Sequence, residues 1–139
     1  GLPLPVATMP ISPWAGWDTS GATYDTRAAQ DALVSRDTTN ALGSMFIGEK
    51  GDPKPPLANP LYTDYSGFPP IYLTVGDAES LLDDSLRIAE RARKAGVEVK
   101  LDNYPEMQHV FQFLAGTAPE ADEVIKQMAR WVRPRLGLK

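Results

Sequence analysis

The residues best suited to acid–base chemistry are one histidine and two acids. His109 is the only histidine in the chain, so any imidazole chemistry must occur there. Asp77 and Glu79 follow Gly76, the residue that ends an apolar run over residues 71–75. In doubly wound sheets, functional side chains lie just beyond the carboxyl ends of the strands. A carboxylate in that position can orient a histidine and stabilise its cation, as general base catalysis requires.

A purely structural interpretation of the same residues is also available. Asp77 and Glu79 precede a helical segment, and acidic side chains are favoured at the positive end of a helix. Taken alone, His109 fits a surface histidine or a helix-capping one as well as a catalytic base. The spacing by itself leaves both interpretations open.

The composition excludes several other kinds of site. With no cysteine and one histidine, the chain lacks a thiolate nucleophile and the ligands of an ordinary zinc site, so we expect no metal or cofactor. Its 14 basic and 18 acidic residues give a net charge of -4, which argues against nucleic-acid binding. No apolar run approaches the ~20 residues of a membrane span, and the N-terminal residues do not resemble a signal peptide. We expect a cytoplasmic location.

The elements that would position these residues are clearest in the second half of the chain. Residues 71–75 have the continuous β-prone pattern of a strand buried on both faces. Residues 80–95 predict a helix, with Ser80 and Asp83 at the spacing of a capping box. Apolar and polar residues then alternate over residues 97–101, which indicates a second strand. This order predicts parallel strands whose two carboxyl ends share one rim of the sheet.

The first half of the chain is less regular. Residues 6–12 predict a short strand, although Pro10 weakens it because proline lacks a ladder donor. Residues 14–68 are irregular, with helices expected over residues 26–36 and 37–46.

A final helix is expected over residues 119–136, where Thr117 and Glu120 have the spacing of another capping box. The chain therefore predicts an α/β fold, a small parallel sheet flanked by helices. Such a sheet has two open edges, and the first strand begins close to the start of the chain. We therefore expect more of the sheet to precede it.

Several short motifs are distinctive in combination. They are GDAESLLDDS (residues 76–85), AERA (89–92), AGV (95–97), MQHVF (107–111), ISPW (11–14) and NPLY (59–62). Each is weak alone, but jointly they are specific and span nearly the whole chain. Together they resemble the hormone-sensitive-lipase-like carboxylesterases, a group of α/β-hydrolases that includes bacterial esterases and lactone hydrolases.

This resemblance implies the C-terminal portion of a single α/β-hydrolase domain. Residues 14–68 would lie near the substrate pocket, and residues 69–139 would carry the acid and the histidine. The catalytic order of the family is serine, acid, histidine. Its acid falls on Glu79, with Asp77 as the runner-up, and its histidine falls on His109. Many members have Asp where this chain has Glu, a change of residue type that keeps the carboxylate.

The resemblance also shows what the sequence lacks. No serine lies in the G-x-S-x-G pattern of the family's nucleophile, and the H-G-G oxyanion motif is absent. We expect the N-terminal half of the same hydrolase to supply both, and we expect the isolated chain to be inactive. The implied activity is hydrolysis of a small carboxylic ester through an acyl-enzyme. The alternatives are a lactone hydrolase of the monoterpene or epsilon-lactone type and a non-catalytic, hydrolase-derived binding module.

The resemblance further places substrate-pocket residues in two regions. Trp14, Met45 and Phe46 come from the irregular segment, and Val110 and Phe111 directly follow the histidine. The alternative is core packing, because aromatic and methionine side chains are mostly found in the core.

Overall fold

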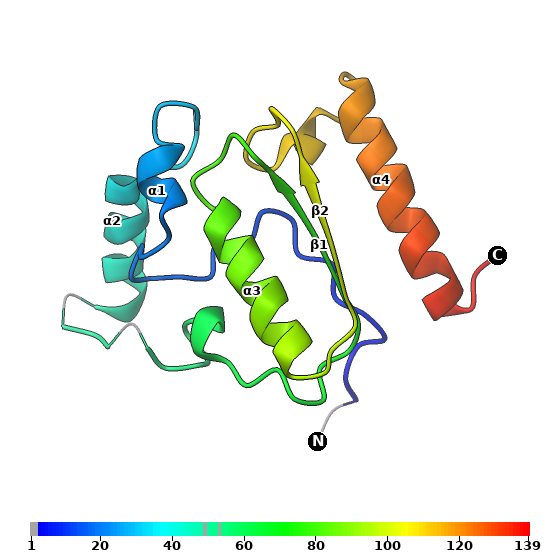
Figure 1. Cartoon of the computed structure of the whole chain (residues 1–139), viewed down its shortest axis with the longest axis horizontal. Helices are drawn as coiled ribbons and strands as arrows, with labels where there is room; N and C mark the ends of the chain where they lie inside the picture. Colours follow the sequence, from blue (N-terminus) through cyan, green and yellow to red (C-terminus); the bar gives the residue numbers. More distant parts are fainter. Residues whose placement is uncertain (1–2, 49, 53) are drawn as a thin grey trace.

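A parallel pair of strands forms the centre of the molecule (Figure 1). The computed structural model describes residues 3–48, 50–52 and 54–139. Strand β1 (Ile71–Gly76) pairs with β2 (Val99–Tyr104), with Gly76 opposite Tyr104 at the carboxyl ends. Helix α3 (Leu82–Lys94) connects them. The expected strand, helix and strand are confirmed, and so is the parallel pairing.

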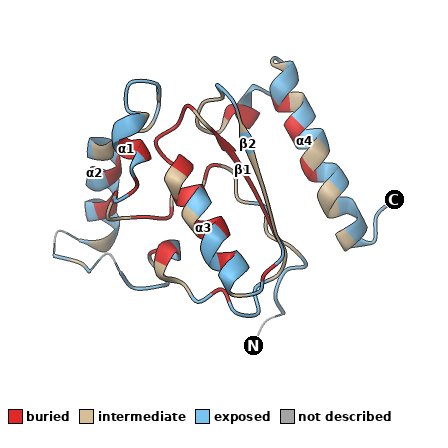
Figure 2. Cartoon of the chain, viewed as in Figure 1, coloured by how far each residue is buried: buried red, intermediate tan, exposed pale blue. Residues whose placement is uncertain are grey.

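Both faces of β1 are covered. Its residues are all buried, as its β-branched and aromatic side chains favour. Ile71 and Leu73 pack with apolar residues of α3, whereas Tyr72 packs with residues of helix α4 (Pro119–Val132). Figure 2 shows β1 buried along its length, while the outward faces of α3 and α4 are exposed. The alternating side chains of one strand therefore join two separate parts of the core.

A segment near the N-terminus runs beside the other edge of β1. Isolated parallel bridges join Thr8 to Ile71 and Ile11 to Thr74. The proline between these bridges has no N–H for a ladder, so the strand expected over residues 6–12 is reduced to them. Among the described residues, no further strand pairs with the outer edge of this segment or of β2.

Helix α2 (Arg36–Ile47) confirms the helix expected over residues 37–46. Its start is fixed by Ser35, whose side chain accepts a hydrogen bond from the backbone N–H of Thr38. Only α2 of the expected helices in this half is well formed within the described residues.

The helix expected over residues 26–36 is wrong. Helix α1 (Thr23–Thr26) ends where that helix was to begin, and a turn follows. Asp31 explains the turn, because its Oδ1 accepts the backbone N–H groups of Leu33 and Val34 at 2.9 and 2.8 Å. A side chain that takes up nearby backbone donors in this way competes with helix formation.

The capping box expected at the start of α3 is also wrong. The N-cap is Leu81, which makes no side-chain capping bond. Ser80 donates its hydroxyl to a backbone carbonyl of the loop before α2. Asp83 accepts the backbone N–H groups of Ala22 and Thr23 with its Oδ2. Both side chains therefore hold the first half of the chain against α3 and do not cap it.

The final helix shows the same departure. Its N-cap is Ala118, without a side-chain capping bond, so Thr117 and Glu120 do not form the expected box. Pro119 does occupy the first helical turn as expected.

No helix in the described part of the chain is long and apolar enough to cross a membrane. Short 3-10 turns occur at Pro60–Tyr62 (η1), Phe111–Leu114 (η2) and Arg133–Leu136 (η3).

A buried carboxylate, Asp84, anchors the loop that follows the N-terminal segment. Asp84 is 1% exposed, and its Oδ2 accepts the backbone N–H groups of Ala15 and Gly16 at 2.9 and 3.0 Å. Burial raises the pKa of Asp84 above its usual value, and the two N–H groups oppose that shift only in part. The charged acid thus fixes the loop at a cost in desolvation.

Gly76 ends β1 where the backbone leaves no room for a side chain. A Cβ at this position would lie 2.1 Å from the carbonyl oxygen of Met107, in the loop after β2. That carbonyl accepts the backbone N–H of Ala78 at 3.2 Å. The missing side chain therefore lets the loop after β2 close on the loop after β1.

We expect Asp84→Ala to lower the free energy of unfolding by about 2–4 kcal/mol, because it leaves the N–H groups of Ala15 and Gly16 buried without an acceptor. Urea unfolding checks this. Asp84→Asn is the matched control, since it keeps an acceptor oxygen and removes the charge.

A raised folded-state pKa means that ionising Asp84 weakens the fold. The stability of Asp84→Asn relative to the parent should therefore improve as the pH rises from about 4 through the raised pKa. A stability difference that is flat across this range would contradict the assignment.

We expect Gly76→Ala to destabilise the fold by roughly 3 kcal/mol, since the new methyl group would collide with backbone and not with a movable side chain. Gly43→Ala is the control. Its Cβ would approach only the Trp17 side chain and main chain, at 3.0 Å or more, within a helix that gains propensity from alanine. Equal effects of the two substitutions on the urea midpoint would refute the proposed close approach.

Candidate active site

Glu79 and His109 meet at the carboxyl end of the sheet. Glu79 lies in the loop between β1 and α3, and His109 lies in the loop between β2 and η2. Glu79 Oε2 is 2.8 Å from His109 Nδ1. The Glu79 side chain is fully buried, whereas the His109 ring is 20% exposed. The parallel strands thus bring together two side chains that lie 30 positions apart in the chain.

The second carboxylate oxygen of Glu79 is also fully engaged. Oε1 accepts the backbone N–H of Gly76 at 2.6 Å and the hydroxyl of Ser12 at 2.8 Å. These donors compensate a charge that would otherwise be costly to bury. None of them is an amide of α3, so the Glu79 side chain does not cap that helix.

The contact with Glu79 sets the orientation of the histidine ring. The carboxylate accepts a hydrogen bond from Nδ1–H, which leaves Nε2 of the neutral ring as the acceptor. No hydrogen-bond partner of Nε2 is found among the described residues. A ring held in this way can take up a proton at Nε2 as a general base.

Asp77, the runner-up acid, has a different partner. Its Oδ1 accepts the backbone N–H of Glu106 at 2.6 Å. It therefore ties the loop after β1 to the loop after β2 through the backbone. Of the two acids identified from the sequence, the structure brings Glu79 to His109.

A cavity of about 380 Å³ opens beside the His109 ring. It is mainly apolar, with a few hydroxyl groups, as ligand sites usually are. Its wall combines the N-terminal segment, the loop before α2, one face of α2 and the histidine loop. The lining residues are Ile11, Ser12, Pro13, Trp14, Leu33, Val34, Thr38, Thr39, Leu42, Leu81, His109 and Val110.

The substrate-pocket residues expected from the sequence divide into two groups. Trp14 and Val110 line the cavity, whereas Met45, Phe46 and Phe111 do not. Met45 and Phe46 are 82% and 67% exposed on α2, where Phe46 stacks on Trp17. Phe111 is buried in the core between β1 and α4. A role in substrate binding for these three residues stays a prediction.

The loop before α2, which forms part of the cavity wall, is held by polar side chains that could not be identified from the sequence. Gln108, next to the histidine, donates to the carbonyl of Gln30 at 2.8 Å and accepts the N–H of Ala32 at 3.0 Å. Asp31 Oδ2 accepts the backbone N–H of Ser80 at 2.7 Å, next to Glu79. The cavity wall is thus bonded directly to both loops that carry the acid–base pair.

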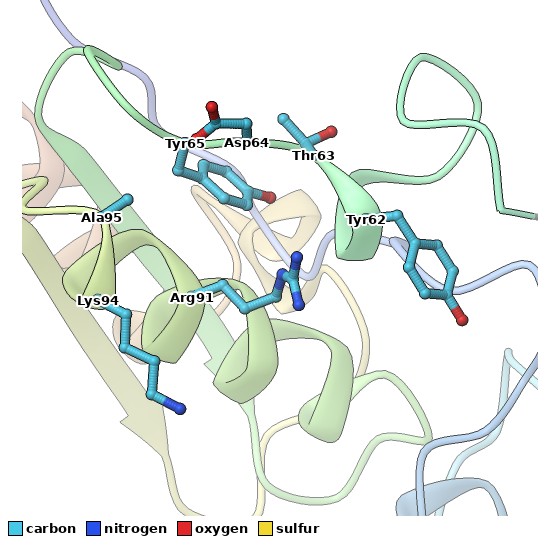
Figure 3. A pocket seen from close by; sticks show the side chains of 7 residues that line it. All are labelled: Tyr62, Thr63, Asp64, Tyr65, Arg91, Lys94 and Ala95. Atoms are coloured by element: carbon cyan, nitrogen blue, oxygen red, sulfur yellow. The ribbon is translucent and has the colours of Figure 1, made fainter.

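A second hollow, of about 430 Å³, lies near the C-terminal end of α3 (Figure 3). Its lining includes Tyr62, Tyr65, Arg91 and Lys94 and shares no residue with the first cavity. Lys94 already pairs with Glu90 at 2.6 Å. No group of three or more metal-ligating side chains is found among the described residues.

Comparison with known proteins places the chain in a family. Residues 1–113 match the family described as having the alpha/beta hydrolase fold. The chain is 34% identical to an acetyl-hydrolase of Streptomyces hygroscopicus over 99% of its own length and 46% of the relative's. It is 30% identical to an esterase of Acinetobacter venetianus, over 92% of this chain and 42% of that one. The chain thus spans less than half the length of these relatives.

Solved structures give the same result. The chain superimposes on an esterase from the bacterial hormone-sensitive lipase family with a TM-score of 0.94 and 36% identity. It superimposes on a hormone-sensitive lipase from a metagenome library with a TM-score of 0.92 and 38% identity. In both cases the match covers 97% of this chain and 45% of the other. The chain therefore belongs to the alpha/beta hydrolase family, in its hormone-sensitive-lipase-like group.

Proposed function

We propose that this chain supplies the acid and the base of a serine-dependent carboxylic ester hydrolase. The observation that carries the proposal is the 2.8 Å contact between the buried Glu79 carboxylate and His109 Nδ1, with the ring beside an apolar cavity. Glu79 orients the ring and His109 is the general base. Esterase and acetyl-hydrolase relatives support the same reaction class.

The proposed reaction passes through an acyl-enzyme. His109 Nε2 takes the proton of a serine hydroxyl as that oxygen attacks the ester carbonyl, and then returns it to the departing alcohol. Water then attacks the acyl-enzyme while His109 takes its proton, and His109 returns that proton to the serine oxygen as the carboxylic acid leaves. Throughout, Glu79 stabilises the imidazolium that forms at His109 without itself taking the proton.

The nucleophilic serine comes from outside this chain in our proposal. Ser12, the serine nearest the pair, donates its hydroxyl to Glu79 and so is committed elsewhere. The relatives are more than twice as long as the region that they share with this chain, which leaves room for a nucleophile and an oxyanion site. We infer that the N-terminal half of the same hydrolase is the partner, on the same polypeptide or another chain.

The cavity favours a small, uncharged substrate. Most of its lining is aliphatic or aromatic, and its polar groups are hydroxyls and the histidine. An ester with an apolar acyl or alcohol group fits this chemistry, and a lactone is the alternative substrate.

A cytoplasmic location remains our expectation. A hydrolase-derived module that only binds ligand would give binding without turnover in the assays below.

We expect the isolated chain to release no p-nitrophenol from p-nitrophenyl acetate or butyrate above the buffer rate. Without the nucleophile and oxyanion donors, the acid–base pair alone has little to act on. Hydrolysis by the purified chain that disappears in His109→Ala would overturn the assignment of the nucleophile to another segment.

In the polypeptide that joins this chain to its nucleophile-bearing segment, we expect Glu79→Gln to lower kcat by about 10³–10⁴-fold, because the amide no longer stabilises the imidazolium. His109→Ala should abolish turnover to a similar degree.

Asp77→Asn is the matched control for Glu79→Gln, since it changes the neighbouring acid by the same chemistry. We expect less than about a tenfold change, because Asp77 bonds only backbone. The measurement is the steady-state kcat of both variants with an open-chain ester and with a lactone, which also shows which substrate is hydrolysed faster. A larger loss in Asp77→Asn than in Glu79→Gln would reject Glu79 as the acid.

A further inference from the structure

Ser12 joins the acid and the histidine loop through one hydroxyl. This residue is 3% exposed at the end of the N-terminal segment that runs beside β1. Its hydroxyl donates to Glu79 Oε1 at 2.8 Å and accepts the backbone N–H of Val110 at 3.3 Å. Val110 directly follows His109 in the chain. One small side chain therefore touches both the carboxylate and the backbone next to the ring.

The backbone at both ends of this link is unusual. Ser12 has a φ of 43° and Val110 a φ of 48°, in the left-handed region that side-chain-bearing residues rarely adopt. For a β-branched residue such as Val110, this conformation is disfavoured by about 1–2 kcal/mol or more. Such strain persists where surrounding contacts impose it, and it is concentrated at functional sites. The contacts here are the hydrogen bonds that join Ser12 to Thr74, Glu79 and Val110.

If the Ser12 side chain served only to fill space in the core, the placement of its hydroxyl would have no explanation. A serine that merely occupied space would not need its proton on one partner and its lone pair on another. Here the proton is given to Glu79 and the lone pair to Val110, and Ser12 N–H is given to the Thr74 carbonyl at 2.8 Å. Its three polar contacts therefore reach β1, the loop after β1 and the loop after β2.

We propose that Ser12 is a positioning residue of the acid–base pair. Its hydroxyl holds Glu79 Oε1 so that Oε2 faces His109, and it fixes the backbone after the histidine at the same time. This role rests on the proposed function of Glu79 and His109. It makes the relay a group of three side chains within this chain, supplied by three neighbouring strand ends.

The same hydroxyl moderates the charge that His109 experiences. A hydrogen bond to Oε1 draws part of the negative charge of Glu79 away from the ring. Without it, the carboxylate attracts the imidazolium more strongly, and the ring keeps its proton to a higher pH. Removing Ser12's hydroxyl should therefore shift the protonation of His109 upward.

The lone histidine makes this shift directly measurable in the 139-residue chain. Proton NMR of the ring protons gives the pH midpoint of His109 without interference from another histidine. In Ser12→Ala we expect the midpoint to rise by roughly half to one pH unit. Ser12→Gly should give the same shift, and it protects the test against misfolding because glycine accepts a φ of 43° readily.

Ser80→Ala is the matched control, since it also removes a buried hydroxyl, one that bonds the loop before α2 and not the pair. Its His109 midpoint should equal that of the parent. An unchanged or lowered midpoint in both Ser12 variants, or an equal rise in Ser80→Ala, would overturn the proposal.

Activity of the completed enzyme then separates this proposal from the one on which it rests. Ser12→Ala should lower kcat about tenfold and move the acid limb of the pH–rate profile upward, with partial recovery in Ser12→Cys. Full activity of His109→Ala would reject the proposed function itself, whereas the NMR midpoints report on Ser12 whether or not hydrolysis occurs.

Discussion

A charged carboxylate buried away from water must find its compensation within the protein, and Glu79 shows what that requires of the chain. Its side chain is fully buried, and both oxygens are held by donors from different elements. Those donors are a backbone amide at the end of β1, a hydroxyl on the N-terminal segment and the ring after β2. The requirement to satisfy one anion therefore brings three separate parts of the chain to one point.

The loops around the cavity are organised by the same kind of interaction. The segment between the N-terminal bridges and α2 has little regular structure, so few of its backbone donors are satisfied by secondary structure. Acidic side chains accept them instead. Asp83 and Asp84 accept N–H groups from the first part of this segment, and Asp31 accepts N–H groups from its last part and from the loop before α3. Because Asp83 and Asp84 sit at the start of α3, the cavity wall is anchored to the same helix that follows Glu79.

The sequence predicted the regular elements well and the loop contacts poorly. The buried run of β1 and the periodicity of α3 and α4 depend on local patterns, and the structure reproduces them. The capping box at Ser80 failed because the spacing does not reveal the tertiary partners that take up the side chains of Ser80 and Asp83. The box at Thr117 failed because α4 begins one residue later, with Ala118 as its N-cap. The helix expected over residues 26–36 failed for a local reason, since Asp31 takes up the backbone N–H groups of Leu33 and Val34.

The candidate site shows a similar division. Glu79 and His109 were identifiable because their loops follow adjacent strands, and the motif resemblance ranked Glu79 above Asp77. Ser12 could not be identified from the sequence, which gives no sign that its hydroxyl would reach Glu79, 67 positions away. The stacking of Phe46 on Trp17 could not be predicted either, because it depends on how α2 packs against a distant loop.

The pairing of β1 with β2 sets the distances at this site. Gly76 lies opposite Tyr104, so the two loops leave the sheet at the same height. A slip of one residue would turn every side chain of a strand to the other face. A slip of two would keep the faces but displace the loops by about 7 Å, far more than the 2.8 Å that joins Glu79 to His109. The register of the two paired strands thus sets the distance between the acid and the histidine.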